Sequence, residues 1–179
     1  MKKLDFALIP FDSKTAPTIE ITGTISRQDH QLNIEYLFTG DLATIIIPPP
    51  AKTAPTRQYD LWEHTCLEFF LGLEDTTAYW EFNLSPAGNW NVFHLKDYRQ
   101  DLAEEMVITS LPFTVLQSTD SMQLNLELDL NPIISATQNL EVGITSVVEN
   151  QDQQLSYWGL QHPASEPDFH QRDTWMIRL

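Results

Sequence analysis

Apolar and polar residues alternate along much of the chain, and this two-residue period is typical of β-strands with one face in a core. In the segment 121–130, every even-numbered residue is Met or Leu and every odd-numbered residue is polar. Similar runs are bounded by turns rich in Pro, Asn, Asp and Gly, and each run predicts a strand. The predicted strands are 4–9, 18–26, 31–39, 43–47, 61–73, 78–84, 90–95, 121–130, 140–149, 154–160 and 174–179, with one or two more in 106–117.

Helix patterns are scarce, and the segment 98–105 is compatible with either a short helix or a loop. Many short strands with little helix predict an all-β fold, namely an antiparallel two-sheet β-sandwich of jelly-roll or immunoglobulin-like type. No internal repeat, linker or low-complexity run divides the chain. We therefore expect residues 1–179 to form a single domain.

The predicted strand 61–73 differs from the others because its second face is not ordinary solvated surface. From residue 67 onward, its core side is an uninterrupted apolar face of Leu67, Phe69, Leu71 and Leu73. Its other side carries Trp62, His64, Cys66, Glu68 and Phe70. A solvated sheet face normally carries Lys, Thr, Glu or Ser. A Trp, a His, a thiol and a carboxylate together are typical of a binding surface.

The strand that follows is joined to the first by the polar residues 74–77, which predict a four-residue hairpin loop. This loop places Glu68 opposite Asn83 and Phe70 opposite Glu81, while apolar residues pair with apolar residues on the core side. The register therefore predicts that polar groups from two strands share one face.

A third strand, 90–95, follows a turn rich in Pro, Gly and Asn. With Phe93 and Leu95 facing the core, Trp90 and His94 join the polar side. The predicted polar-aromatic face consists of Trp62, His64, Glu68, Tyr79, Glu81, Asn83, Trp90 and His94.

Two interpretations of this predicted face remain open. Aromatic planes with carboxylate, amide and imidazole groups between them suit polyhydroxylated ligands, because ring C–H faces stack while hydroxyls need hydrogen-bond partners. Alternatively, a loop or helix such as 98–105 covers the face, and its aromatic side chains form a second small core.

Composition narrows the possible partners. Ten Lys and Arg against 25 Asp and Glu give a formal charge of −15, which repels phosphate backbones and anionic lipid and leaves neutral or cationic small ligands compatible. The single cysteine, Cys66, forms no internal disulfide and fits a reducing compartment. No signal-peptide pattern and no bilayer-length apolar stretch is present in the sequence, so we expect a cytoplasmic protein without membrane or nucleic-acid partners.

Glu68 and Glu81 raise the question of glycoside hydrolysis. On neighbouring strands at a diagonal offset they would lie about 7 Å apart, within the range of carboxylate pairs that cleave glycosides. Two acids on one sheet face are also common without such activity, and spacing alone is weak evidence. We therefore expect no catalytic residues.

The sequence predicts no metal site. His64 and Glu68 are four residues apart along a strand, about 13 Å, and so cannot share an ion. Asp168 and His170 have no chelating spacing with His162, and a loop held by its own hydrogen bonds explains all three.

The chain resembles the DOMON-like domains of bacterial proteins, relatives of the family 9 carbohydrate-binding modules, in the segments LWEHTCLEFFLGL, YWEFNLSPAGNWNVFHLKDYR and YWGLQHPASEPDFH. The resemblance implies a β-sandwich with a ligand site on or beside one sheet, in a family that binds sugars or haem. By position, it implies that Trp62 and Trp158 stack on a ligand and that Glu68 is a polar contact. Haem-binding members use a Met and a His as axial ligands, and Met106, Met122 and Met176 lie outside the predicted face, so haem is the weaker option.

These observations predict a non-catalytic domain, without a required cofactor, that binds a carbohydrate or a sugar-containing metabolite. We expect Glu68, Glu81 and Asn83 to hydrogen-bond the ligand hydroxyls, with Arg57 or His64 at the rim. The alternatives are a haem-binding or redox domain, a glycoside-acting enzyme that uses the two acids, and a structural or protein-interaction domain. The sequence does not predict an oligomeric state.

Overall fold

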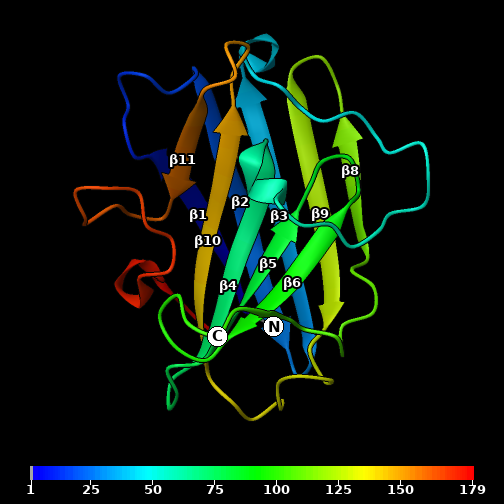
Figure 1. The fold of residues 1–179 in the computed structure, drawn as a ribbon, viewed down its shortest axis with the longest axis vertical. Coiled ribbons are helices and arrows are strands. Elements are labelled where there is room, and N and C mark those ends of the chain that lie inside the picture. Colours follow the sequence, from blue (N-terminus) through cyan, green and yellow to red (C-terminus); the bar gives the residue numbers. More distant parts are fainter. Residues whose placement is uncertain (1) are drawn as a thin grey trace.

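A computed structural model describes residues 2–179, which form twelve β-strands and three one-turn 3₁₀ helices (Figure 1). The strands are β1 (Lys2–Pro10), β2 (Ile19–Gln28), β3 (Gln31–Gly40), β4 (Cys66–Leu73), β5 (Tyr79–Leu84), β6 (Trp90–Leu95), β7 (Ala103–Glu104), β8 (Phe113–Gln117), β9 (Ser121–Asp129), β10 (Leu140–Glu149), β11 (Leu155–Gly159) and β12 (Ile177–Arg178). The 3₁₀ helices are η1 (Leu42–Thr44), η2 (Leu61–Glu63) and η3 (Arg172–Thr174). No helix within 2–179 is long and apolar enough to cross a bilayer.

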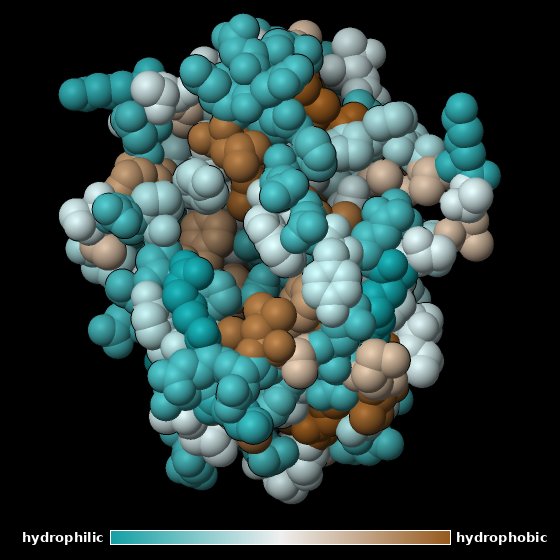
Figure 2. All heavy atoms as spheres, viewed as in Figure 1, coloured by the Kyte–Doolittle hydropathy of each residue, from teal (hydrophilic) through white to brown (hydrophobic). Residues whose placement is uncertain are grey.

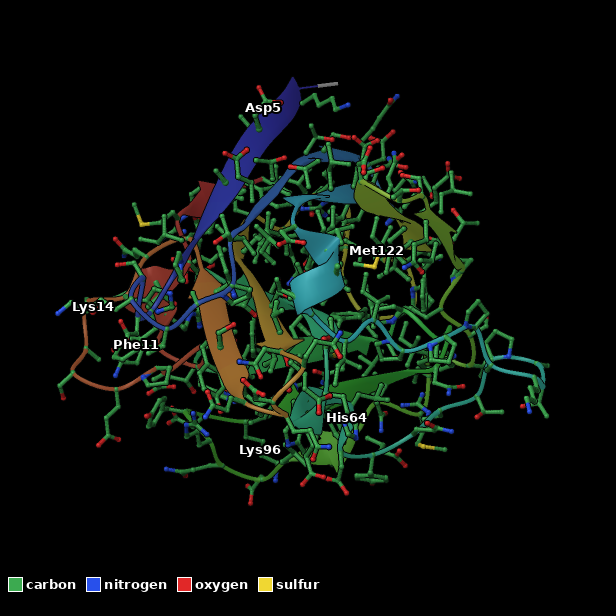
Figure 3. All side chains as sticks on the ribbon, turned by 90° about the horizontal axis from the view of Figure 1, so that it is seen from above. Asp5, Phe11, Lys14, His64, Lys96 and Met122 are labelled. Carbon is green, nitrogen blue, oxygen red and sulfur yellow. The ribbon has the colours of Figure 1, made fainter. Side chains whose placement is uncertain are left out.

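The strands form two antiparallel layers, so the predicted all-β sandwich is confirmed. One layer has the order β1-β2-β3-β9-β8 and the other β7-β6-β5-β4-β10-β11, with β12 beside β10. Strand β1 connects the layers, because it pairs with β2 as far as Leu8 and then with β11 through Ile9 and Pro10. Figure 3, which looks along the strands, separates the two layers.

The main core fills the space between the layers. Strand β9 has the predicted alternation, with its Met and Leu side chains buried and the residues between them more exposed. Across from it, the β4–β5 hairpin contributes Phe69 and Phe82, whose rings stack 4.3 Å apart. These residues are directly opposite each other, as the four-residue loop predicted. Burial of such large apolar side chains is the main stabilising contribution to a sandwich of this size.

A second, smaller apolar cluster lies on the outer face of the β4–β5–β6 layer. It consists of Phe70, Tyr79, Phe93, Leu95 and Trp175, with Trp62 and Phe169 partly buried against it. Trp175 comes from the segment after β11, which crosses this face, and its ring lies on the backbone at Gly143 of β10. A Cβ atom at Gly143 would overlap that ring, so a glycine in mid-strand makes room for the crossing segment.

Four predicted elements were wrong in part or left open. In the predicted strand 174–179, Thr174 ends η3 and Ile177–Arg178 form β12. Residues 43–47 form η1 and a single bridge at Ile45 instead of a strand. The start of the predicted strand 61–73 is the 3₁₀ turn η2, because Asp60 adopts a left-handed backbone conformation (φ 59°) and strand pairing begins only at Cys66. Segment 98–105 is a loop that ends in the short strand β7.

Candidate ligand-binding pocket

A cavity of about 600 Å³ opens on the outer face of the second layer. Figure 2 shows this side of the molecule, where hydrophobic side chains appear between hydrophilic ones in the middle of the face. Strands β4, β5, β10 and β11 contribute residues to its lining, and so do the segments around Arg99 and Phe169. The face is therefore partly covered, because segments around Arg99 and Phe169 lie over it. A cavity nevertheless remains between these segments and the strands.

Two acids from neighbouring strands lie on the pocket floor. Glu68 of β4 is 3% exposed and Glu81 of β5 is 6% exposed. The register pairs Glu68 with Asn83 and Phe70 with Glu81, as predicted, so the two acids are diagonal neighbours on one face. The acids are therefore near the ligand space and shielded from bulk water.

The hydrogen bonds of the two acids differ. Glu81 Oε1 accepts a 2.9 Å hydrogen bond from the Asn83 amide, and Glu68 Oε2 accepts one of 3.3 Å from the Thr145 hydroxyl. Glu68 Oε1 is buried and has no hydrogen-bond partner among residues 2–179. Burying an oxygen without a hydrogen-bond partner lowers the free energy of unfolding by about 1 to 3 kcal/mol. A ligand that hydrogen-bonds this carboxyl group would offset part of that loss.

Burial changes the acidity of both groups. Desolvation, followed by the nearby Glu81 carboxyl, raises the pKa of Glu68 well above its ordinary value. Desolvation also raises the pKa of Glu81, although the Asn83 amide and Arg99 partly oppose it. Both acids therefore hold their protons more tightly than exposed glutamates do.

His170 extends from the crossing segment over these acids. Its Nδ1 is 2.7 Å from the Tyr79 hydroxyl, and its Nε2 is 3.8 Å from Glu81 Oε2. The Tyr79 oxygen accepts a hydrogen bond from the Arg99 backbone N–H, so donation of its own proton to Nδ1 satisfies both groups. Burial, and then the Arg99 charge, lowers the pKa of His170 to about 4. The imidazole is therefore neutral at pH 7, with its Nε2–H toward the pocket floor.

Aromatic rings line the sides of the pocket. Trp62 enters from η2, and its ring meets Phe93 edge-on at 5.9 Å. On the other side, Tyr157 of β11 and Phe169 of the crossing segment form an edge-to-face pair at 6.1 Å. Flat apolar surfaces thus flank the polar floor.

Asp168 ties the two covering segments together. Its carboxylate accepts hydrogen bonds from the Tyr98 hydroxyl at 2.5 Å, from Arg99 Nη2 at 3.0 Å and from the His170 backbone N–H at 3.1 Å. Burial opposes ionisation of Asp168, but the bonds from Tyr98 and Arg99 outweigh it and lower its pKa. The predicted self-bonded loop is therefore present, and its partners extend to the segment 97–102.

The prediction that Trp90 and His94 belong to this face was wrong. Trp90 lies opposite Leu84 and is buried in the main core, while Phe93 and Leu95 point to the pocket side. His94 packs against Trp80 at 5.0 Å, outside the pocket. Residues directly opposite each other on paired strands have side chains on the same face of the sheet. Because Leu84 points into the main core, its partner Trp90 does so too.

Trp158 was also placed on the wrong face. It is 3% exposed and belongs to the main core, and the adjacent Tyr157 faces the pocket instead. Strand β11 pairs Tyr157 with Val147, and Val147 pairs in turn with Cys66 on the pocket side of β4. The strand register therefore identifies Tyr157, which sequence reasoning missed by one residue.

Neither predicted rim residue lines the pocket. Arg57 makes its contacts outside the pocket. Its guanidinium lies 4.5 Å over the Trp90 ring and donates a hydrogen bond to Asn91 Oδ1. It also donates to the backbone oxygens of Glu105 and Ile108. The His64 side chain is 64% exposed and bonds Glu149 on the outside of the second layer (Figure 3). Trp62, Glu68 and Glu81 do line the cavity, and Asn83 supports it through its bond to Glu81.

The side chains that could bind a metal ion or haem iron lie apart from one another. No group of three metal-ligating side chains occurs among residues 2–179, and His162 bonds the Ile9 backbone oxygen. Met122 is buried in the main core, whereas Met106 and Met176 are exposed and lie outside the residues that line the cavity. A Met–His axial pair for haem therefore does not fit this pocket.

Comparisons with known proteins establish the fold. No protein-family model matches the chain, and no curated protein matches its sequence. A Bacteroides uniformis structure described as a "putative carbohydrate-binding protein" matches with a TM-score of 0.72 and 12% identity, over 96% of this chain and 84% of that one. A family 9 carbohydrate-binding module from Caldicellulosiruptor kristjanssonii, solved with cellotriose, matches with a TM-score of 0.52 and 5% identity, over 84% and 70%.

Proposed function

We propose that this chain is a non-catalytic binding domain and that a carbohydrate or a sugar-containing metabolite occupies its pocket. The observation that carries the proposal is the combination of aromatic planes with buried hydrogen-bonding groups in one cavity of about 600 Å³. This volume lies within the usual range for small-molecule sites, about 300 to 1,000 Å³. Both fold relatives are described in terms of carbohydrate binding, which supports the same ligand class.

The chemistry of the pocket matches a sugar ring. The C–H faces of a pyranose stack on aromatic planes, which Trp62 and Tyr157 provide. The hydroxyl groups need acceptors and donors at the ring edge. Glu68 Oε1 has no partner among the described residues and can accept a hydrogen bond, or donate one when the acid is protonated, and the Nε2–H of His170 is a donor near the floor. Trp62 and Glu68 also carry the resemblance to DOMON-like domains, so we propose that this chain is related to them.

The electrostatics favour binding over hydrolysis. A glycosidase needs one carboxylate that is ionised at working pH, beside one carboxylic acid that donates a proton. Burial raises the pKa of Glu68 and also that of Glu81, and no Lys or Arg forms an ion pair with either among the described residues. Two acids that both favour the protonated form suit hydrogen bonding to a bound sugar.

Calorimetric titration with a panel of mono- and disaccharides that includes neutral sugars and amino sugars tests this proposal. We expect at least one sugar to bind, and we expect Trp62→Ala to weaken it about tenfold, the equivalent of roughly 1.4 kcal/mol of lost stacking. His64→Ala is the matched control, because His64 follows η2 closely but lies outside the cavity. The proposal is wrong if no sugar binds, or if both variants bind as the wild type does.

A further inference from the structure

The two floor acids lack a positive partner. Among residues 2–179, the nearest basic group is His170, whose Nε2 is 3.8 Å from Glu81 and which burial keeps neutral. Arg99, which also lines the pocket, is held by Asp168 at 3.0 Å. No basic side chain forms an ion pair with Glu68 within the described residues. Without a bound cation the two carboxyl groups therefore hold their protons, and a cation placed beside them would favour their ionised form.

The other groups around Glu68 do not supply charge either. Thr145 donates a hydroxyl to Oε2, and the Tyr36 hydroxyl donates to the Glu68 backbone oxygen at 2.6 Å. The Cys66 thiol is buried, and desolvation followed by Glu68 raises its pKa well above its ordinary value, so it stays neutral. Glu68 therefore lines the cavity with one buried oxygen, Oε1, that has neither a proton donor nor a cation beside it among residues 2–179.

The walls of the pocket also suit a cation. An ammonium group is attracted to the negative face of an aromatic ring, most strongly to Trp and Tyr, and this attraction grows when water is excluded. Trp62, Phe70 and Tyr157 line the same cavity as the acids. The net charge of −15 further raises the local concentration of positively charged ligands around the protein.

We propose that the preferred ligand is an amino sugar, and that its protonated amine lies against the Glu68 carboxyl group, beside Glu81. This inference rests on the proposed carbohydrate-binding function and specifies its ligand. An ammonium group has three N–H donors, so it can satisfy the free Glu68 oxygen and a Glu81 oxygen at once. A neutral sugar can hydrogen-bond the same carboxyl groups in their protonated form, whereas a bound cation also favours their ionisation and gains the attraction of the charge that results.

Calorimetry at pH 6 with three matched sugars tests the inference: glucose, N-acetylglucosamine and glucosamine, repeated with the galactose series. The members of each series share a ring and differ at one position, and only the third carries a charge. We expect at least one amino sugar to bind tenfold or more tightly than its two neutral counterparts. We expect Glu68→Gln, which keeps the shape and removes the acid, to abolish this preference.

The control is Glu149→Gln, which removes an acid of similar burial outside the pocket and is expected to keep the preference. Circular dichroism confirms that each variant folds, and Glu81→Gln is a second test of the floor. Equal or tighter binding of the neutral sugars overturns the inference and leaves carbohydrate binding intact. A preference that survives Glu68→Gln reflects only the overall negative charge and also overturns it. If no sugar of either series binds, the proposed function fails as well.

Discussion

At the scale of single residues, the pocket contains buried polar groups that lower the free energy of unfolding. Glu68 and Glu81 are buried acids, and one oxygen of Glu68 has no partner among the described residues. Leaving such an atom unsatisfied costs about 1 to 3 kcal/mol, and side chains with strongly shifted acidity cluster at functional sites. A bound ligand that satisfies the oxygen would recover part of this cost.

His170 makes the folding stability depend on pH. Its pKa falls from 6.5 in the unfolded chain to about 4 in the folded state. The unfolded state therefore takes up a proton first as the pH falls, and the contribution of His170 to stability is full above pH 6.5 and declines toward pH 4. Between pH 7 and pH 5 we expect a loss of about 2 kcal/mol from this residue.

Urea unfolding of the wild type and of His170→Gln at both pH values measures this loss. The glutamine keeps a polar side chain near Tyr79 but does not titrate. We expect the wild type to lose about 2 kcal/mol more than the variant between pH 7 and pH 5. Identical pH dependence of the two proteins would contradict a neutral, buried His170.

At the scale of elements, strand pairing explains which site residues could be predicted. The β4–β5 hairpin has a short loop and one wholly apolar face, so its register and the positions of Glu68 and Glu81 followed from the sequence. Strand β6 is buried on both faces, and alternation of apolar and polar residues cannot decide between Trp90 and Phe93 in such a strand. The same ambiguity separates Tyr157 from Trp158.

The covering segments could not be placed in advance. Residues 161–173 have no periodic pattern, and their position depends on long-range contacts such as the hydrogen bond that Arg99 donates to Asp168. Asp168 and His170 were recognised as a self-bonded loop, but no local signal places that loop over β4 and β5. The strand glycines Gly72 and Gly143 are the signal that a large side chain lies on the sheet, because a Cβ atom at either position would meet the Trp175 ring.

Gly143→Ala tests how this segment is held. The added methyl group would overlap the Trp175 ring, whose Nε1 donates to the Phe169 backbone oxygen at 2.9 Å. We expect a loss of about 1 to 3 kcal/mol in the free energy of unfolding and faster amide exchange across 161–175. Gly159→Ala is the control, since its nearest contact is the movable His162 side chain at 3.3 Å. Unchanged exchange in Gly143→Ala would contradict the docking of this segment through Trp175.

At the scale of the whole molecule, the sandwich is a scaffold whose outer face carries the proposed ligand pocket. Two solved structures share the fold at 12% and 5% identity, so the layers tolerate almost complete replacement of the sequence. A fold held in common does not determine what its members bind, and the ligand must be argued from the side chains in the pocket. Here those side chains are the aromatic walls and the acidic floor.

The indole N–H signals of the five tryptophans give the most direct measurement of where a ligand binds. Trp62 lines the pocket, whereas Trp80, Trp90 and Trp158 belong to the main core. In ¹H–¹⁵N NMR spectra recorded during a sugar titration, with the Trp62 signal assigned from Trp62→Ala, we expect that signal to move with saturation. The three core indoles should stay in place. If no indole signal moves, or if only the core signals move, sugar binding in this pocket is contradicted.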